Sequence, residues 1–455
     1  MTEHEVKAYE FWRNRLQECR HILAPMVDQS ELAFRLLVRQ YYAIECCYTP
    51  MINANSFIKN IKYRKQSLQT TPEDRPLILQ FCANNSDVLL EASRIAASHC
   101  DAIDINLGCP QSVAKRGHYG AFLMDEWDLI YDMINRVSRE IQIPITCKIR
   151  IFPEMDKSVA FAQMLEKAGV SMICVHGRRR DQKGPLTGRA DWDYIKAIKN
   201  AVKIPVFANG NILSLNDVHN CLAQTGVEAV ISAEGLLHNP ALFTDKRVPI
   251  WTVAEQYLSL ARQHPCPISF IRGHIFKFFY HCFMLSSNED QRERVAKAHD
   301  MTVFEEVTQE LKTRYEEIYE REAKETDNWN NCTTLPPYIC QPYLRPEPKL
   351  VDQLTTTKRV PECEPEECKI RLSKKKLKRM NRVVSGVEVN DEKVVPKRIL
   401  CALCPNPKGE KCDFNICRTC CRKKTFAETL DCNGHKFQMK TRFSKKCQNV
   451  NTLNT

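Results

Sequence analysis

Short apolar runs alternate with amphipathic segments from about residue 20 to residue 245. The runs are rich in Ile, Val and Leu and lack a strict apolar–polar alternation, which is typical of parallel strands covered on both faces. The segments between them repeat apolar residues at three- and four-residue steps, as helices do. We therefore predict eight strands, at 21–26, 43–51, 77–84, 102–110, 145–150, 172–178, 206–212 and 229–236.

Eight strand–helix units within about 225 residues are typical of a (β/α)8 TIM barrel, which is an α/β fold. The alternative is a doubly wound sheet, because a sequence pattern does not show whether the sheet closes on itself. We place the barrel domain at 1–248.

Polar and glycine residues collect where the predicted strands end. In a barrel, functional groups gather at the C-terminal ends of the strands. A core built only for packing would not put Gln, Asn, Cys, Lys, Arg and His at successive strand ends, so the pattern predicts an active site there. The run ends carry Ala24-Pro25-Met26, Gln80, Asn106 with Cys109, Lys148 with Arg150, His176 with Arg178, Asn209-Gly210-Asn211 and Ala233-Glu234-Gly235.

The stretch Asp104-Ile105-Asn106-Leu107-Gly108-Cys109-Pro110 ends one strand in a Gly-Cys-Pro turn. A free cysteine is usually a small buried apolar residue, but this thiol lies at a strand end. An ordinary thiol has a pKa near 8.5 and is mostly protonated at neutral pH. Cys109 also lacks an obvious paired base, so we expect it to act as a proton donor and not as a thiolate nucleophile.

A proton donor at the mouth of a barrel needs a chemical partner. The late strands of barrels commonly form a phosphate site from backbone N–H groups, and the loops holding Gly210 and Gly235 are in the right position. Flavin mononucleotide (FMN) would put its phosphate there, with Lys148 stabilising the reduced ring. Together, a hydride from FMN and a proton from Cys109 would reduce an activated carbon–carbon double bond.

The pattern becomes helical after the barrel, and we predict a small helical domain at 249–325. Residues 326–400 are rich in proline and charge, and we expect a mostly disordered linker. Within that linker the aromatic segment 336–345 is expected to dock back on the folded part. The basic stretch 369–382 is compatible with an RNA-binding arm and with a nuclear-import signal.

A cysteine-rich segment follows at 401–440, ahead of a tail at 441–455 that we expect to be disordered. Cys-x2-Cys and Cys-x2-His spacings suit the tetrahedral thiolate and imidazole coordination of structural zinc. Eight ligands permit two ions, but the sequence does not assign them. The candidate ligands are Cys401, Cys404, Cys412, Cys417, Cys420, Cys421, Cys432 and His435.

The chain has 455 residues and a formal net charge of +11, which points to a polyanionic partner. The N-terminus lacks the apolar core of a signal peptide, and no apolar run approaches the ~20 residues of a membrane span. We therefore expect a soluble protein, cytoplasmic and/or nuclear, and a monomer. Reducing conditions there would make the 23 cysteines serve metal binding, catalysis or packing.

The ordered motifs resemble the tRNA-dihydrouridine synthase family across about residues 20–325, and most closely its eukaryotic 16/17-type branch. The motifs that carry the resemblance are Ala24-Pro25-Met26, Leu79-Gln80, Asp104 to Pro110, Arg116-Gly117-His118-Tyr119-Gly120-Ala121, Lys148-Ile149-Arg150, His176-Gly177-Arg178, Ala208-Asn209-Gly210-Asn211, Ser232-Ala233-Glu234-Gly235-Leu236 and Cys340-Gln341-Pro342-Tyr343.

The resemblance implies an enzyme that reduces a D-loop uridine of tRNA at position 16 and/or 17, with tightly bound FMN and with NADPH or NADH as electron donor. Cys109 would protonate C5 of the base, while flavin N5 delivers hydride to C6. Asn106 and Arg178 would position the base, and the helical domain would bind tRNA. The residues implied to hold FMN are Pro25, Met26, Val27, Gln80, Lys148, His176, Asn209, Gly210, Asn211, Ala233 and Glu234.

One departure concerns the phosphate. Many bacterial members have Gly-Arg where this chain has Ala233-Glu234, so backbone amides and another cation, such as Arg178, would have to replace that arginine. Two other functions stay open. The first is an FMN barrel that reduces a free pyrimidine, which leaves the helical and cysteine-rich segments unexplained. The second is a non-enzymatic RNA-binding protein on an inactive barrel.

Overall fold

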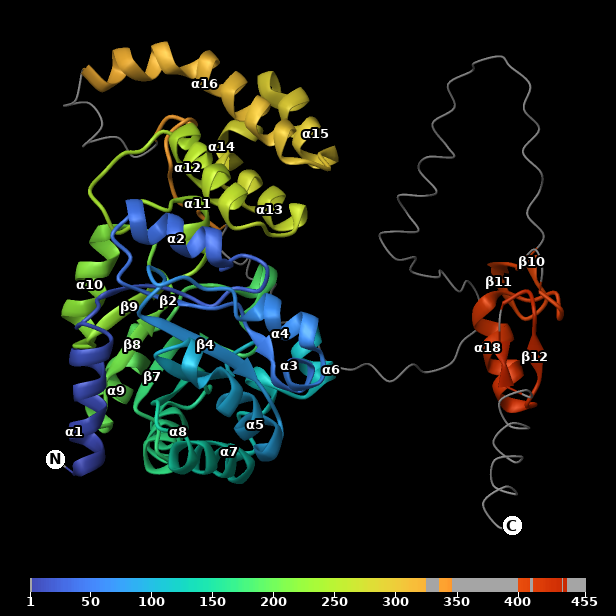
Figure 1. Ribbon diagram of the computed structural model, residues 1–455, viewed down its shortest axis with the longest axis horizontal. Coiled ribbons are helices and arrows are strands. Elements are labelled where there is room, and N and C mark those ends of the chain that lie inside the picture. The colour runs from blue at the N-terminus through green and yellow to red at the C-terminus, as the bar shows by residue number, and fades with distance from the viewer. Residues whose placement is uncertain (1, 325–334, 346–399, 410–411, 436, 440–455) are drawn as a thin grey trace, which may run out of the picture. The chain divides into compact units, whose positions relative to one another are not determined.

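The computed structural model describes residues 2–324, 335–345, 400–409, 412–435 and 437–439 (Figure 1). Internal contacts divide the chain into two units, Met1–Thr355 and Thr356–Thr455. Most of the predicted linker and the whole tail lie outside the described residues. Among the described helices, none combines the length and the apolarity that crossing a bilayer requires.

Eight parallel strands close into a barrel in the first unit, which confirms the predicted fold. Each strand pairs with the next, and β9 pairs in parallel with β1, so the sheet has no open edge where a doubly wound sheet would have two. A short extra strand, β3 (Ile52–Asn53), pairs with β4. The barrel strands are β1 (His21–Leu23), β2 (Cys46–Tyr48), β4 (Leu77–Cys82), β5 (Ala102–Leu107), β6 (Ile145–Ile151), β7 (Met172–Arg179), β8 (Val206–Asn209) and β9 (Ala229–Ser232).

Helices surround the strands and cover their outer face (Figure 1). Their ends follow local sequence: Asn85 caps the start of α5 by accepting from Val88 N–H, and Gly169, in the left-handed region, ends α8. The helices of this part are α1 (Glu3–Glu10), α2 (Leu32–Tyr41), α3 (Ala54–Lys59), α4 (Ile61–Ser67), α5 (Ser86–Ala96), α6 (Ser112–Gly117), α7 (Trp127–Glu140), α8 (Met155–Ala168), α9 (Trp192–Ala201), α10 (Leu215–Thr225) and α11 (Glu234–His238).

Alternation along each strand separates the outer face from the barrel interior. In β5, Ile103, Ile105 and Leu107 join the apolar cluster shared with the helices, whereas Ala102 joins a second, inner cluster. Asp104 and Asn106 share the face of Ala102 and lie further along the strand. The interior is therefore apolar at the start of the strands and polar towards their C-terminal ends, where the site lies.

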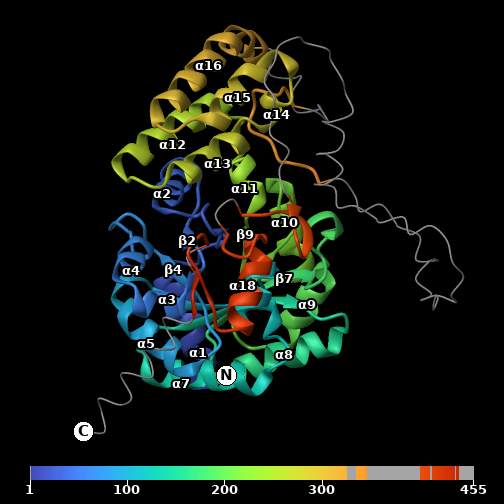
Figure 2. The same cartoon turned by 90° about the vertical axis from the view of Figure 1, so that its right-hand side faces the viewer.

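The helical region that follows belongs to the same unit and lies beyond α2 and α11 (Figures 1 and 2). A buried contact joins it to the barrel: Glu31, before α2, accepts from Tyr257 Oη (2.8 Å) and lies 3.0 Å from His274 Nε2. Its helices are α12 (Ile250–Gln263), α13 (Ile268–Phe278), α14 (Tyr280–Phe283), α15 (Glu289–Lys297) and α16 (Met301–Lys324).

The described residues of the second unit form two small hairpins and one helix. Cysteines supply most of its apolar core. The described elements are β10 (Leu400–Cys401), β11 (Cys404–Pro407), α18 (Arg418–Ala427), β12 (Asp431–Cys432) and β13 (Phe437–Gln438).

Candidate functional site

A chain of buried hydrogen bonds links the ends of β4, β5 and β6. Gln80 Nε2 donates to Asp104 Oδ2 (2.8 Å), and Asn106 Nδ2 donates to Gln80 Oε1 (2.8 Å). Thr146 Oγ1 donates to Asp104 Oδ1 (2.6 Å), so both carboxyl oxygens are held. Burial raises the pKa of Asp104 to about 6. These bonds fix the Gln80 amide in a single orientation.

Asn106 also holds the loop that carries Cys109. Its Oδ1 accepts from Cys109 N–H (2.9 Å) and from Gly108 N–H (3.2 Å). Gly120 has a φ of +67° and packs so closely that a Cβ there would lie 2.8 Å from Cys109 O. Cys109 is only partly buried. The thiol-bearing residue is thus held at the barrel mouth, as predicted, and not inside the core.

Lys148 lies opposite Asn106 in the β5–β6 register. Its Nζ donates to Asn209 Oδ1 (2.7 Å), and Asn209 Nδ2 donates in turn to Ile231 O (2.7 Å). Lys148 is 9% exposed, and burial lowers its pKa. A buried ammonium whose hydrogen bond goes to a neutral amide is costly, so this position favours a ligand rich in acceptors.

His176 and Arg178, at the end of β7, form a second polar group. Arg178 Nη1 lies 3.0 Å from His176 Nε2, and Arg178 Nη2 donates to Asn211 Oδ1 (2.7 Å). Burial and then the nearby positive charge of Lys148 hold the pKa of His176 well below its ordinary value, so its imidazole is neutral at pH 7. Asn211 has a φ of +63°, which Asn tolerates better than most residues.

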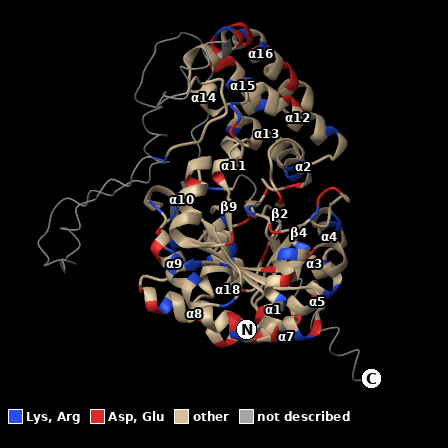
Figure 3. Ribbon diagram, turned by 90° about the vertical axis from the view of Figure 1, so that its left-hand side faces the viewer, with Lys and Arg blue, Asp and Glu red and all other residues tan. Residues whose placement is uncertain are grey.

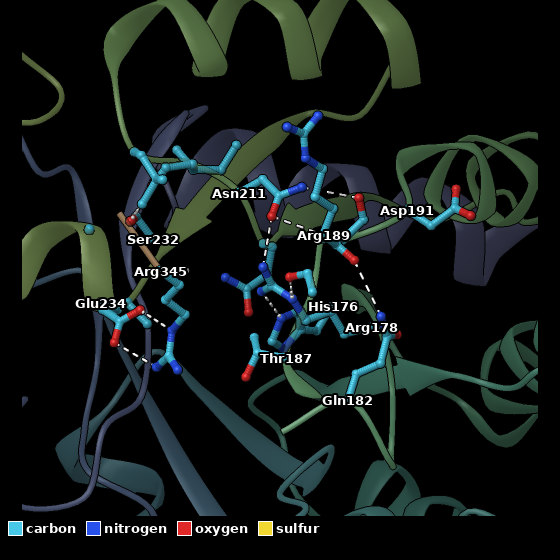
Figure 4. Close-up of a pocket in the computed structure, with 18 of the residues that line it drawn as sticks. His176, Arg178, Gln182, Thr187, Arg189, Asp191, Asn211, Ser232, Glu234 and Arg345 are labelled. Carbon is cyan, nitrogen blue, oxygen red and sulfur yellow. Dashed lines mark hydrogen bonds and ion pairs between the residues drawn. The ribbon is translucent and has the colours of Figure 1, made fainter. Parts of the chain in front are cut away.

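His176, Arg178 and Asn211 border a cavity of ≈ 1210 Å³ at the C-terminal ends of the late strands (Figure 4). The lining of this cavity does not include Gln80, Asn106, Cys109 or Lys148. Gly210, with a φ of +108°, has no room for a side chain, because a Cβ would lie 2.6 Å from Ala190 Cβ. Pro25, Met26 and Val27 follow β1, and Val27 is 55% exposed. The predicted residues that line the cavity are His176, Arg178, Asn209, Gly210, Asn211, Ala233 and Glu234.

Three residues near the site have contacts that sequence reasoning left without a role. Asp104 orients Gln80, and its only sequence signal is a carboxylate inside an apolar run. Arg150 Nη1 donates to Arg179 O (2.7 Å), while its buried Nε has no partner among the described residues. Arg345 pairs with Glu234 across 111 positions of sequence, and no local pattern could have found this contact.

Charge is distributed unevenly over the first unit (Figure 3). The loops around the mouth carry exposed cations, including Lys115, Arg116, Arg180 and Lys183, and Lys183 Nζ donates to Pro110 O (2.6 Å). In contrast, α16 has seven glutamates and four Lys or Arg. A polyanion would therefore be attracted to the mouth and repelled by α16.

The cysteine-rich unit brings seven of the eight predicted metal ligands into two groups. Cys412, Cys421, Cys432 and His435 are all buried, and their ligand atoms lie within 4.8 Å of one another. Cys401, Cys417 and Cys420 form the other group. The side chain of Cys404 lies outside the described part of the structure. The members of the two groups are interleaved along the chain, which is why spacing alone could not assign them.

Comparison with known proteins supplies the family. The model of the family described as "Dihydrouridine synthase (Dus)" matches residues 22–333. The mouse protein named "tRNA-dihydrouridine(16/17) synthase [NAD(P)(+)]-like" is 48% identical over 97% of this chain and 92% of its own. The Schizosaccharomyces pombe "tRNA-dihydrouridine(16/17) synthase [NAD(P)(+)]" is 40% identical over 76% of this chain and 92% of its own.

Among solved structures, a 2-naphthoyl-CoA reductase complex matches with a TM-score of 0.39 and 10% identity over 49% of each chain, a similarity that adds nothing to the sequence matches. The family model covers more than half of the chain, and two relatives are at least 40% identical over most of their length. These matches confirm the family that the sequence motifs indicated. This chain belongs to the dihydrouridine synthase family.

Proposed function

We propose that this protein is a tRNA-dihydrouridine synthase that reduces the C5–C6 double bond of a D-loop uridine, at position 16 and/or 17, with electrons from NADPH or NADH. The curated relatives carry these positions and this cofactor class in their names. The observation that carries the proposal is local: Asn106 holds the Cys109 loop at the mouth and bonds to Gln80, directly opposite Lys148 in the register.

The residues at the mouth fit FMN. Gln80, Lys148 and Arg150 present buried amide, ammonium and guanidinium donors, and the Arg150 Nε lacks a partner among the described residues. A flavin ring offers carbonyl and nitrogen acceptors, and its phosphate is an anion. Gly210 leaves the backbone open to close approach. Pro25, Met26 and Val27 would line the ring, and His176, Asn209, Asn211, Ala233 and Glu234 would border its ribityl and phosphate.

Bound and reduced FMN supplies a hydride from N5 to C6 of the uracil ring. The residues of the chain do the rest. Cys109 would donate its Sγ proton to C5, and its place at the mouth depends on Asn106. Asp104 keeps the Gln80 amide turned so that its oxygen accepts from Asn106, which leaves the second Nε2–H of Gln80 for the cofactor.

The target base must leave its stack to reach a barrel mouth, as in other enzymes that modify bases. Asn106 is the side chain we propose to position it. Arg178, which the resemblance also implies for this role, lines the cavity with Glu234 and Arg345, and we assign it to the cofactor phosphate instead. The exposed cations around the mouth would contact tRNA phosphates, and the helical region would bind the rest of the molecule through faces other than α16. We further propose a monomer that acts in the cytoplasm, the nucleus or both.

We also propose that the second unit binds two zinc ions. One ion would be held by Cys412, Cys421, Cys432 and His435. The other would be held by Cys401, Cys417 and Cys420, with Cys404 supplied by the same Cys-x2-Cys pair. In a tetrahedral site with Zn–S bonds of about 2.3 Å, ligand atoms lie about 3.6–3.8 Å apart. The 3.8 Å between Cys432 Sγ and His435 Nδ1 supports this assignment.

The test uses the purified full-length protein. We expect a yellow protein that, with NADPH or NADH, forms dihydrouridine in unmodified tRNA and leaves free uracil unchanged. Mapping dihydrouridine in tRNA from cells that lack the protein should show loss at position 16, 17 or both. Turnover of free uracil would favour a pyrimidine reductase instead. A colourless protein that binds tRNA without reducing it would favour the inactive barrel.

A further inference from the structure

The segment that follows the helical region returns to the barrel. Ile339 bridges antiparallel to Pro249, Ile250 N–H donates to Tyr338 O (3.0 Å) and Cys340 N–H donates to Val248 O (2.9 Å). Tyr338 and Cys340 are each 4% exposed. This confirms the predicted docking of 336–345, and it fixes where the end of the segment lies.

An aromatic contact directs the last residues of this segment to the cavity. The Tyr343 ring stacks on His238 of α11, with centroids 5.5 Å apart, and meets Tyr280 edge to face at 5.0 Å. His281 Nε2 lies 3.3 Å from Pro342 O. With Tyr343 held against α11, the chain has two residues in which to reach Glu234 at the start of that helix.

Arg345 makes that contact. Its Nε and Nη2 donate to Glu234 Oε2 and Oε1, each at 2.7 Å, and both residues line the cavity (Figure 4). The pair is accessible, because the two side chains are 43% and 36% exposed. A guanidinium has five N–H donors, so this pairing uses two of them.

The charges of Glu234 and Arg345 determine whether this part of the cavity can bind an anion. Without Arg345, the carboxylate of Glu234 would repel an anion in this part of the cavity. With it, that repulsion is cancelled, and Arg178 supplies a second cation on the same cavity wall. Burial and the positive charge of Arg345 both lower the pKa of Arg178, which shows that the two guanidinium groups feel each other. Two like charges held near one cavity are stabilised by an anion between them.

We propose that Arg345 is a phosphate-binding residue for the mononucleotide cofactor, supplied by the segment beyond the helical region and acting with Arg178. The proposal rests on the proposed function, because it takes the bound group to be FMN. It assigns to position 345 the cation that the Ala233-Glu234 sequence does not provide. The chemistry recognised is a terminal phosphate monoester, which FMN has and riboflavin lacks.

The experiment titrates flavin-free, full-length protein with FMN and with riboflavin, following flavin fluorescence. We expect wild type to prefer FMN, and Arg345→Ala to weaken FMN binding at least tenfold while changing riboflavin binding less than twofold. Arg345→Lys should restore part of the difference. Arg262→Ala is the matched control, because it removes an exposed arginine that pairs through two hydrogen bonds with Glu305 away from the cavity, and it should bind both flavins like wild type.

Glu234→Gln separates phosphate binding from a purely structural ion pair. If Arg345 binds phosphate, Glu234→Gln frees it and FMN affinity should stay equal or rise. If the ion pair only fixes the loop, Glu234→Gln and Arg345→Ala should each lower the affinity for FMN and for riboflavin to a similar extent. This result would overturn the proposal. Unchanged FMN binding by Arg345→Ala, or a loss confined to tRNA binding, would also overturn it. Failure of wild type to bind either flavin would instead overturn the proposed function and this inference with it.

Discussion

Cysteines play different parts in the two units. In the barrel, Cys147 and Cys174 are fully buried members of apolar clusters, and burial raises the pKa of each thiol. In the second unit, Cys412, Cys421 and Cys432 lie together with His435. Cys109 matches neither case, because it is partly exposed at the barrel mouth. These differences in surroundings are the basis for expecting packing, metal binding and proton donation, respectively, from the three kinds of cysteine.

The same contrast extends to how each unit is stabilised. The barrel buries a continuous apolar cluster that runs between strands and helices. In the described part of the second unit, Ile416 is the one fully buried member of the apolar cluster that is not a cysteine. A core of that size supplies little hydrophobic free energy, so we expect metal coordination to hold this unit together.

Removing zinc should have the largest effect, and on one unit alone. A structural zinc site contributes about 10–16 kcal/mol to folding, so a strong chelator should unfold the second unit. The described part of the first unit holds Trp12, Trp127, Trp192 and Trp251, so their fluorescence should not change. Hydrogen exchange of the α18 amides should rise sharply on chelation.

The metal content sharpens this result. We expect two zinc ions per chain in the wild type, and about one in Cys421→Ser. Cys221→Ser, which alters a buried barrel cysteine, should leave two and serves as the control. A metal-free wild type with protected α18 amides would contradict the proposed coordination.

Replacing the reactive cysteine should have the next largest effect, on turnover and not on folding. Loss of a proton donor typically lowers a rate by about 10²–10⁴-fold. Cys109→Ala should therefore keep its flavin and its melting temperature but oxidise reduced flavin far more slowly when tRNA is added in a single turnover. A normal single-turnover rate would exclude Cys109 as the acid.

The matching change in the core should do the reverse. Cys147→Ser puts a hydroxyl where the structure offers an apolar site, and the unfolding free energy should fall by about 1–3 kcal/mol with turnover retained. Cys147→Ala separates the effect of the hydroxyl from the loss of sulfur. In the native wild type, iodoacetamide should label Cys109 and spare Cys147, whose pKa is raised by burial. Equal labelling would break the distinction between the two thiols.

The sequence predicted the barrel well, because each buried strand is a short continuous run of apolar residues. All eight predicted runs overlap a barrel strand, and seven of them begin at its first residue, while 43–51 begins three residues before β2. Several predicted ends ran too far, as in 206–212 against Val206–Asn209, because apolar and glycine residues continue into the loop. Some of the overrun residues, such as Gly210, Asn211 and Ala233, line the cavity, since site residues follow strand ends in this fold.

The features that the sequence did not predict depend on contacts between residues far apart in the chain. The carboxylate of Asp104 stands out in an apolar strand, but its partners Gln80 and Thr146 come from two other strands. Arg345 reaches Glu234 only because Tyr343 and Ile339 dock first. The members of the two ligand sets of the second unit are interleaved along the chain, so no spacing rule separates the sets.

The smallest expected effect tests whether the second unit contacts RNA once its fold is intact. Arg422 and Lys423 are exposed on α18 and are not metal ligands, so Arg422→Gln with Lys423→Gln should keep both zinc ions. Each lost phosphate contact lowers the slope of log affinity against log salt concentration by about 0.7–0.9. The slope of the double variant should therefore be smaller by up to about 1.8, and its affinity for tRNA should fall mainly at low salt. Lys7→Gln, in α1 and paired with Glu3, is the control for lost charge outside the proposed tRNA-binding surfaces and should leave the slope unchanged. If the double variant keeps the wild-type slope, Arg422 and Lys423 do not contact tRNA phosphates. The cations at the barrel mouth would then be the candidates for binding tRNA.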